Sequence, residues 1–593
     1  MSMKPKWWYI RMKAQEWVGL DTETTDGWVR VLATSEEEFI ESRDSADLID
    51  FIYQRLGPDR PGVFYNLKYD AGCILKTAAM LDGAGVRSKE FTVGGYRIKL
   101  IPGKALTIAP TDARGWGSVR VCYDAAQFYP GGLERNAAKV LGRHKSDTEL
   151  SLDRARIGSE AGYYEAHRED IIRYCIQDCK LTRDLMAKFQ ADVREALGVY
   201  PKTWYSGASI AKAYLAQVYQ NPFYDWPIDL IADSVAAYRG GIFTTPVLGR
   251  TENAVEYDIN SAYPAALAHL PDLRDITPQA TNRRHDDALL GLYLVNVRYD
   301  GTLPYYTQRG NTIYPVSMEP LPAWLTDIEI VRYPQVEVVR GWEWFGKKWS
   351  FLERPITEAY KARQALKKAG DSRERAYKTA LNSMYGAFAE TKEGWTKQTN
   401  LVYAAWTAGY IRDYIRDLIK MSGGMENTLT VATDAVFFRK DPKIPESEVL
   451  GDLKVGFRGT VVSYMNGMRL ENGSIVSRGF RSLTPRMLVE AKGPSLRVKE
   501  TGPLPLVKGI VRNDVSRVGS WVTEEKEIDL RTNLARYVYP VSDLTFETLL
   551  EREVVGYPLV VTSPGWQKIL TPDQRDALER GERPGKWEEP EDE

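Results

Sequence analysis

The stretch LDTETT carries two acidic residues, Asp21 and Glu23, two positions apart in a strand-like run. Because side chains alternate between the two faces of a strand, we expect both carboxylates on one face. Asp70 ends another strand-like run, and Tyr174 and Asp178 lie four apart on a predicted helix, a spacing that makes side chains neighbours. Mg²⁺ and Mn²⁺ prefer carboxylate oxygens, and two such ions can activate water in phosphodiester hydrolysis. Taken singly, these patterns also occur on ordinary solvated surfaces.

A second set of chemically capable residues lies further along the chain. Asp258 ends an apolar run, and Asp434 stands between the two apolar runs of VATDAVFF. Aspartate is also common in hairpin turns, because its side chain bonds to the nearby backbone, so Asp434 has a purely structural interpretation too. In KTALNSMYGAF, Lys378, Asn382 and Tyr385 share one stripe of a predicted helix, where they would present a cation, an amide and a ring together. The alternative is an ordinary amphipathic helix with a buried tyrosine.

Length and composition indicate a multi-domain globular protein. The chain has 593 residues, of which 43% are hydrophobic and 27% charged, enough material for several packed cores. The net charge of −1 gives no overall basic signal, so any contact with nucleic acid must come from local patches. All four cysteines lie between positions 73 and 179 with no CxxC pair, which favours reduced, buried thiols. With neither a signal peptide nor a membrane-spanning run expected, the sequence predicts a soluble, cytoplasmic protein.

The patterning divides the chain into mixed α/β segments. Strand-like and helix-like runs alternate up to about residue 190, and the text from about 270 to 348 is rich in proline and aromatic residues with short strand signals. From 354 to 378, eight lysines and arginines face three acids on a helical pattern broken at AGDS, which predicts a basic helical hairpin. The acidic tail GERPGKWEEPEDE is expected to be disordered.

The first set of motifs, in this order, resembles the three motifs of DEDD-type 3′–5′ exonucleases. Tyr174 marks the tyrosine-containing kind. GRHKSD resembles a lysine motif of the same domain in protein-primed polymerases, which implies a catalytic role for Lys145. By the same resemblance, Thr24, Asn66 and Tyr69 would hold single-stranded DNA.

The second set resembles the motifs of family B DNA polymerases. EYDINSAYPAAL is similar to motif A, KTALNSMYGAF to motif B, and VATDAVFF to the hairpin of motif C, while AYRGG is similar to the motif that links the exonuclease and polymerase domains and contacts the template. The resemblance implies that Asp258, Asp434 and the backbone carbonyl of Ile259 hold two Mg²⁺ ions. Tyr263 would stack under the incoming sugar and exclude a 2′-hydroxyl, and Lys378 would neutralise charge on the triphosphate.

The residues implied for each role are as follows. Nucleotide binding would involve Ile259, Tyr263, Lys378, Asn382 and Tyr385, and DNA binding would involve Tyr238, Arg239, Gly240 and Gly241. Metal binding by the exonuclease would involve Asp21, Glu23, Asp70 and Asp178. Further charge on the triphosphate would be met by some of Lys361, Arg363, Lys367, Lys368, Arg373 and Arg375.

The resemblance implies an α/β and α+β multi-domain architecture, with an RNase H-like exonuclease domain followed by a right-hand polymerase of palm, fingers and thumb. The implied boundaries are 1–190 for the exonuclease, 191–269 for the linker with YRGG and the first part of the palm, 270–348 for an inserted subdomain, 349–390 for the fingers, 391–505 for the second part of the palm, and 506–593 for the thumb and acidic tail.

The length and the insertion at about 270–348 resemble the small protein-primed polymerases of bacteriophages and linear plasmids. In that subgroup the insertion contacts a terminal protein that supplies the priming hydroxyl. The implied activity is DNA-directed DNA synthesis with 3′–5′ proofreading, with Mg²⁺ as cofactor and Mn²⁺ as a substitute. The implied partners are primed DNA template, dNTPs, a terminal protein, and a helicase or single-strand-binding protein. The protein is expected to be a monomer that does not bind membranes. Two alternatives stay open: a nuclease whose polymerase half only binds DNA, and a non-enzymatic replication initiation factor.

The sequence departs from the family pattern at several places. Ala432 stands where motif C has its first aspartate, and Ala435 stands where it has a serine. Ala125 and Ala126 replace the usual Ser or Thr followed by Leu. The segment between motifs B and C is short, which predicts weaker strand displacement and processivity, and the K-x-Y motif expected after motif C is not evident around Asn466 and Met468.

Overall fold

The computed structural model describes most of the chain, and its compact parts fall into two units. The described residues are 15–113, 115–145, 152–219, 226–306, 312–317, 319–347, 349–390, 398–464, 468–471, 473–476, 480, 482–491, 493, 495–529, 536–538, 545–562 and 566–569. The first unit comprises residues 1–217, 361–383 and 501–523, and the second comprises 218–360, 384–500 and 524–593. Neither the acidic tail nor Asn466 lies among the described residues.

An eight-stranded mixed sheet forms the centre of the first unit, in the order β3-β2-β1-β4-β8-β7-β6-β5. β1 pairs in parallel with β4, and β4 in parallel with β8, while the remaining pairs are antiparallel. The strands are β1 (Val18–Thr25), β2 (Trp28–Thr34), β3 (Phe39–Ile40), β4 (Gly62–Phe64), β5 (Glu90–Val93), β6 (Tyr96–Ile101), β7 (Ala105–Pro110) and β8 (Arg120–Asp124).

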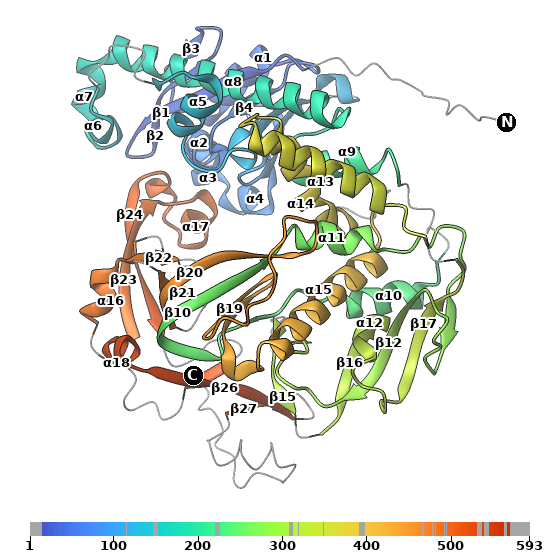
Figure 1. The fold of residues 1–593 in the computed structure, drawn as a ribbon. Coiled ribbons are helices and arrows are strands. Elements are labelled where there is room, and N and C mark those ends of the chain that lie inside the picture. The colour runs from blue at the N-terminus through green and yellow to red at the C-terminus, as the bar shows by residue number, and fades with distance from the viewer. Residues whose placement is uncertain are drawn as a thin grey trace, which may run out of the picture. The chain divides into compact units, whose positions relative to one another are not determined.

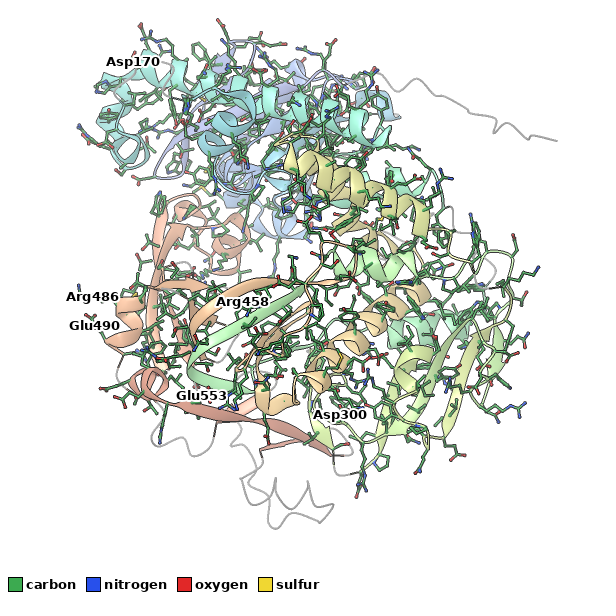
Figure 2. The ribbon with its side chains drawn as sticks, viewed as in Figure 1. Asp170, Asp300, Arg458, Arg486, Glu490 and Glu553 are labelled. Atoms are coloured by element: carbon green, nitrogen blue, oxygen red, sulfur yellow. The ribbon has the colours of Figure 1, made fainter. Side chains whose placement is uncertain are left out.

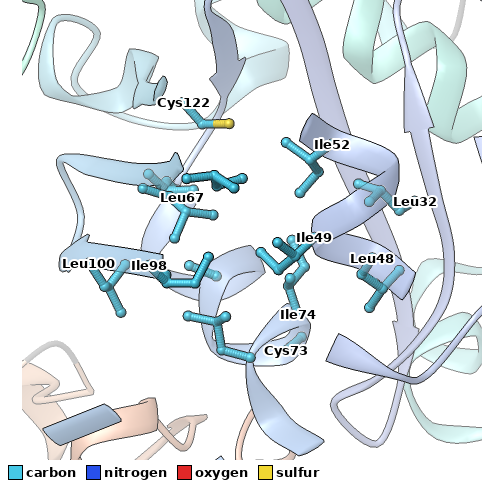
Figure 3. Close-up of a cluster of buried hydrophobic side chains, with 14 of the residues drawn as sticks. Leu32, Leu48, Ile49, Ile52, Leu67, Cys73, Ile74, Ile98, Leu100 and Cys122 are labelled. Atoms are coloured by element: carbon cyan, nitrogen blue, oxygen red, sulfur yellow. The ribbon is translucent and has the colours of Figure 1, made fainter. Parts of the chain in front are cut away.

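Helices pack on this sheet through buried apolar side chains. Figure 3 shows part of one core, in which Leu48, Ile49 and Ile52 of α1 meet Leu67 and Ile74 of α2. The long helix α8 (Arg168–Leu197) packs against β1 and ends at Gly198, whose positive φ of 66° suits glycine. The other helices are α1 (Ser45–Arg55), α2 (Leu67–Ile74), α3 (Lys76–Leu81), α4 (Gly83–Ser88), α5 (Leu133–Leu141), α6 (Arg154–Ser159), α7 (Ala161–Ala166) and α9 (Gly207–Leu215).

Two segments distant in sequence complete the first unit. Ala376 and Ala380, on α14 (Glu374–Phe388), are fully buried in a core with Trp204 and residues of α8. Leu506, on α17 (Leu506–Val511), and Val518 are buried in the core that holds α1 and α2. The predicted basic hairpin is confirmed as α13 (Glu353–Lys368) and α14, interrupted at residues 369–373.

The second unit is built on an eleven-stranded sheet whose main path runs β22-β21-β20-β10-β19-β18-β9. The long strand β10 (Val247–Ile259) pairs with β19 (Ala435–Phe438), β20 (Leu453–Tyr464) and β26 (Glu553–Thr562). Glu553 accepts a hydrogen bond from Thr251 of β10 at 2.7 Å and forms an ion pair with Arg439, which fastens β26 at this place (Figure 2). The other members are β9 (Phe243–Thr244), β15 (Val316–Ser317), β18 (Thr428–Ala432), β21 (Met468–Glu471), β22 (Ser474–Val476), β25 (Arg536–Val538) and β27 (Trp566–Ile569).

Helix α15 (Leu401–Met421) covers one face of this sheet, beside α11 (Ala262–Ala268) (Figure 1). Its buried side chains pack with apolar residues of β10, β18 and β19. A separate four-stranded sheet has the order β11-β17-β12-β16 and is made of β11 (Gln279–Thr281), β17 (Val338–Trp344), β12 (Leu290–Val297) and β16 (Leu321–Thr326). The short strand signals predicted within about 270–348 are therefore confirmed, for example by β12 and β17.

Short elements complete the described chain. They are α10 (Ile228–Ala237), α12 (Asp327–Ile330), α16 (Pro485–Val489), α18 (Phe546–Glu551), β13 (Tyr305–Tyr306), β14 (Thr312–Ile313), β23 (Ser495–Pro503) and β24 (Trp521–Asp529). All four cysteines are buried free thiols, as the sequence predicts. Among the described residues, no helix is both long enough and apolar enough to cross a membrane.

Candidate functional site

The first carboxylate cluster lies on β1 in the first unit. Asp21 and Glu23 are both half-buried, and one carboxylate oxygen from each lies within 4.8 Å of the other and of the Cys175 thiol sulfur. The expectation that both acids share one strand face is therefore confirmed. The sequence did not predict Cys175 as a site residue, because the pattern of a buried cysteine on an amphipathic helix is the same as that of a core residue.

Asp70 and Asp178 add two more carboxylates to this cluster. The pKa of Asp21 is raised well above its usual range by burial and then by the negative charges of Asp178, Asp70 and Glu23. Burial likewise raises the pKa of Asp70 to about 7, although Thr22 donates a hydrogen bond to its carboxylate at 2.6 Å. Four acids thus repel one another in a partly buried place, and a divalent cation would relieve that repulsion.

Lys145 sits within the same cluster. Its ammonium forms an ion pair with Asp178 and lies 3.2 Å from the Tyr174 hydroxyl. Burial raises the pKa of Tyr174, so its hydroxyl remains a proton donor at neutral pH. All six residues predicted for hydrolysis, namely Asp21, Glu23, Asp70, Lys145, Tyr174 and Asp178, are brought together. The donor set is made of hard oxygens, so the residues present fit Mg²⁺ or Mn²⁺.

The three residues predicted to hold single-stranded DNA, Thr24, Asn66 and Tyr69, are held by hydrogen bonds within the first unit. The hydroxyl groups of Thr24 and Tyr69 are 2.6 Å apart and bond to each other. Asn66 adopts a left-handed conformation with φ of 74°, and its backbone N–H donates to the Asp124 carboxylate at 2.9 Å. The same carboxylate accepts from the N–H of Ala126 at 2.9 Å. The segment YDAAQ (residues 123–127) therefore fixes the backbone of Asn66 through Asp124.

The second cluster joins Asp258 and Asp434 across neighbouring strands. Asp258 lies near the end of β10 directly opposite Ala435 of β19, and the N–H of Ile259 donates to the backbone carbonyl of Asp434 at 3.0 Å. Asp434 is in the two-residue turn between β18 and β19, as the sequence predicts. These two carboxylates and the backbone oxygens beside them are hard donors that fit Mg²⁺. Asp258 is paired with a cation here, the Lys454 ammonium of β20.

The turn that carries Asp434 has an unusual backbone. Thr433 is β-branched yet has a positive φ of 69°, a conformation that costs free energy and persists only when its surroundings hold it. Its N–H donates to the Ile242 carbonyl at 2.8 Å. A Cβ atom at Gly241 would come within 2.7 Å of the Thr433 side chain. The second glycine of the YRGG stretch is therefore required by the close approach of this loop to the Asp434 turn.

Tyrosine rings gather beside the second cluster. Tyr263, on α11, lies with its ring 4.4 Å from that of Tyr385, and Tyr385 lies 6.0 Å from Tyr238. Burial and the nearby negative charge of Asp434 raise the pKa of Tyr263 to about 12. The three rings predicted for nucleotide and template contacts therefore lie together, with their planes tilted by 40° and 47° at the two contacts.

A buried ion pair supports the YRGG loop. Arg412 of α15 donates to both carboxylate oxygens of Glu329 at 2.8 and 2.9 Å, and both side chains are only 1% exposed. The same guanidinium donates to the carbonyls of Arg239 and Gly240 at 2.9 and 3.0 Å. Tyr314 donates to the next carbonyl, that of Gly241. No motif pointed to Arg412 or Glu329, although an arginine that follows the largely apolar run AAWTAGYI is a signal for a buried partner.

Some of the basic side chains of the hairpin bind other residues of the protein, and others are exposed. Arg363 pairs with Glu374 at 2.9 Å, Arg373 with Asp371 at 2.6 Å, and Arg375 donates to the Phe128 carbonyl at 3.0 Å. Three of the candidate phosphate contacts thus hold the hairpin together or anchor it. Of the residues implied for nucleotide contacts on the hairpin, the exposed ones are Lys361, Lys367, Lys368, Lys378 and Asn382. Lys378 and Asn382 belong to the first unit, whereas Asp258 and Asp434 belong to the second.

Comparison with known families matches the middle of the chain, which includes Asp178 and Asp258 but not Asp21 or Asp434. Residues 124–404 match the family described as DNA polymerase type B, organellar and viral. A protein named DNA polymerase from Acidianus bottle-shaped virus (isolate Italy/Pozzuoli) is 25% identical over 258 residues, which is 40% of this chain but only 38% of the viral protein. The resemblance to family B DNA polymerases found from the motifs is confirmed.

The fold is similar to that of solved DNA polymerase structures. One is Phi29 DNA polymerase in its complex with primer-template DNA and incoming nucleotide substrates, which is 15% identical to this chain with a TM-score of 0.57. The comparison covers 88% of this chain and 100% of the Phi29 chain. Its orthorhombic crystal form gives a TM-score of 0.60 at 14% identity, with coverage of 87% and 100%. The expected multi-domain α/β architecture is therefore confirmed.

Proposed function

We propose that this protein is a family B DNA polymerase that extends a primer on a DNA template and removes 3′-terminal nucleotides. The observation that carries the proposal is the junction of Asp258 and Asp434, which the 3.0 Å hydrogen bond from the Ile259 N–H to the Asp434 carbonyl brings about. The first cluster, in the other unit of the chain, is a separate group of carboxylates. Two such clusters with hard oxygen donors fit two phosphodiester reactions, one of synthesis and one of hydrolysis.

Synthesis would take place at the second cluster. Asp258, Asp434 and the carbonyl of Ile259 would hold Mg²⁺, which when bound lowers the pKa of the primer hydroxyl and neutralises the leaving pyrophosphate. Tyr263, whose ring lies 4.4 Å from that of Tyr385, would meet the sugar of the incoming nucleotide. Lys378 and Asn382 are exposed on α14 and would bind the triphosphate and base.

Hydrolysis would take place at the first cluster. Asp21, Glu23, Asp70 and Asp178 would hold the cations, with Mn²⁺ as a substitute for Mg²⁺. Tyr174 stays protonated and would donate to the scissile phosphate or the attacking water, and Lys145 would offset negative charge there. Thr24, Asn66 and Tyr69 would position the single-stranded 3′ end.

The partners follow from this proposal. Primed template DNA and dNTPs are supported by the solved complexes of Phi29 DNA polymerase, which contain primer-template DNA and nucleotides. The four-stranded sheet within residues 270–348 would be the surface for a terminal protein that supplies the priming hydroxyl. Such an enzyme would work as a monomer in the host cytoplasm, with a helicase or single-strand-binding protein assisting it. In this scheme residues 349–390 are the fingers and residues from about 506 the thumb.

Separating the two activities tests the proposal. Asp434→Ala should abolish primer extension with Mg²⁺ and four dNTPs but keep 3′ degradation, whereas Asp21→Ala with Glu23→Ala should do the reverse. Extension that is unchanged in Asp434→Ala would falsify the assignment of the second cluster. Absence of both activities in the wild-type protein would instead favour the alternative of a non-enzymatic replication initiation factor.

A further inference from the structure

The Cys175 thiol is the feature of the first cluster that the proposed reaction does not use. Its sulfur and one oxygen from each of Asp21 and Glu23 all lie within 4.8 Å of one another. The sulfur lies 4.0 Å from Oδ2 of Asp21 and donates weakly to that residue's backbone carbonyl at 3.4 Å. Cys175 is fully buried on α8, so the helix fixes its position relative to β1.

This spacing is close to what one tetrahedral cation requires. With metal–sulfur bonds of about 2.3 Å and metal–oxygen bonds of about 2.0–2.2 Å, donor atoms around Zn²⁺ lie roughly 3.5 Å apart. Small rotations of the two carboxylates would bring the three donors to that separation. Mg²⁺ ignores sulfur and takes oxygen ligands only, whereas thiolate is a preferred ligand of softer divalent ions.

We propose that Cys175 makes the first cluster a site for a thiophilic divalent cation, Zn²⁺ or Cd²⁺, whose binding displaces Mg²⁺ and stops removal of 3′-terminal nucleotides while synthesis continues. The inference rests on the proposed exonuclease function of this cluster. Binding breaks the S–H bond, forms a sulfur–metal bond and releases one proton to solvent, and no electron is transferred. Asp21 and Glu23 supply the oxygens, so the soft ion occupies ligands that Mg²⁺ would need.

The distribution of cysteine gives the effect its selectivity. All four cysteines lie between positions 73 and 179, so the unit that carries Asp258 and Asp434 contains none. No thiol is available there, so a thiophilic ion gains no thiolate ligand. Cys122 of β8 is the matched control, because it is an equally buried free thiol of the same unit, whereas the Cys179 thiol is hydrogen-bonded to that of Cys175.

Cadmium titration of the full chain tests the site directly. Cd²⁺ alone should produce an ultraviolet sulfur-to-metal charge-transfer band that saturates at one ion per chain, is lost in Cys175→Ser and persists in Cys122→Ser. A band that persists in Cys175→Ser, or no band in the wild type, would overturn the proposal. Should Cys175→Ser fail to fold by circular dichroism, Cys175→Ala serves in its place, and Asp21→Asn with Glu23→Gln should weaken binding while keeping the sulfur.

The two activities provide the second readout. At fixed excess Mg²⁺, Zn²⁺ should inhibit 3′ degradation by the wild type at a concentration about tenfold or more below that needed for Cys175→Ser. Inhibition of primer extension by Zn²⁺ should need the same concentration in the wild type and in Cys175→Ser. Equal inhibition of 3′ degradation in both proteins contradicts the proposal. Absence of any Mg²⁺-dependent 3′ degradation in the wild type would refute the exonuclease function instead, while the cadmium band would still decide the metal site.

Discussion

Arg412 holds the carboxylate of Glu329 with two hydrogen bonds and, with the other side of its guanidinium, the carbonyls of Arg239 and Gly240. One side chain therefore connects α12, α15 and the loop that approaches the Asp434 turn. The negative charge of Glu329 is stabilised by this arrangement: burial alone would raise its pKa, but Arg412 lowers it below the usual range.

Breaking this pair from one side should destabilise the protein strongly. Arg412→Met leaves Glu329 buried without its partner, a loss of about 3–5 kcal/mol in the free energy of unfolding. Arg412→Met combined with Glu329→Met should recover most of that loss, because no unpaired charge remains. Denaturant unfolding of the single and double variants measures both. A double variant as unstable as Arg412→Met would show that the loop contacts, and not the unpaired charge, dominate.

A methyl group at Gly241 should damage synthesis. In Gly241→Ala the new Cβ would meet Thr433 at 2.7 Å, and displacement of the Asp434 turn by a fraction of an ångström should slow primer extension by about 100-fold. Gly240→Ala is the matched control, since no atom lies within 4 Å of its added Cβ. Comparable losses in both variants would point to DNA contact by the loop and against the steric explanation.

Restoring the missing acid of motif C should change the metal requirement. Ala432 lies two residues before Asp434 and pairs with Ala435 across the hairpin. Ala432→Asp adds a negative charge beside the cluster and should lower the Mg²⁺ concentration for half-maximal extension by about tenfold. Ala435→Ser restores the other departure without adding charge, so it should leave that concentration nearly unchanged. A rise in the Mg²⁺ requirement of Ala432→Asp would contradict this expectation.

Asp327 should make the second unit less stable as pH rises. Burial raises the pKa of this carboxyl to about 7 in the folded protein, against a usual value of 3.8. Its stabilising contribution is complete below pH 3.8 and is lost as pH rises towards 7, at about 1.4 kcal/mol per pH unit. Hydrogen exchange of β12, whose Gly291 N–H donates to Asp327 at 3.1 Å, should show this trend between pH 5 and 7 after correction for intrinsic exchange rates. Asp327→Asn should remove it, and an identical trend in that variant would exclude Asp327 as the cause.

Periodicity was sufficient to predict part of this structure from sequence. The alternation of LDTETT placed Asp21 and Glu23 on one face, and the apolar runs around Asp434 gave the hairpin. Arg412 and Glu329 were missed because their pairing joins positions 83 apart and leaves no local pattern. The basic hairpin was predicted, but charge counts alone could not distinguish Arg363, which is paired with Glu374, from the exposed Lys367.

The route of the chain through its two units limits how the protein can be dissected. The first unit needs residues 361–383 and 501–523, and each of these segments is flanked on both sides by residues of the second unit. No single cut therefore yields an intact first unit, and a fragment ending near residue 217 would lack Ala376, Ala380, Leu506 and Val518 from its cores. Point substitutions in the full-length chain are the way to silence one activity and keep the other.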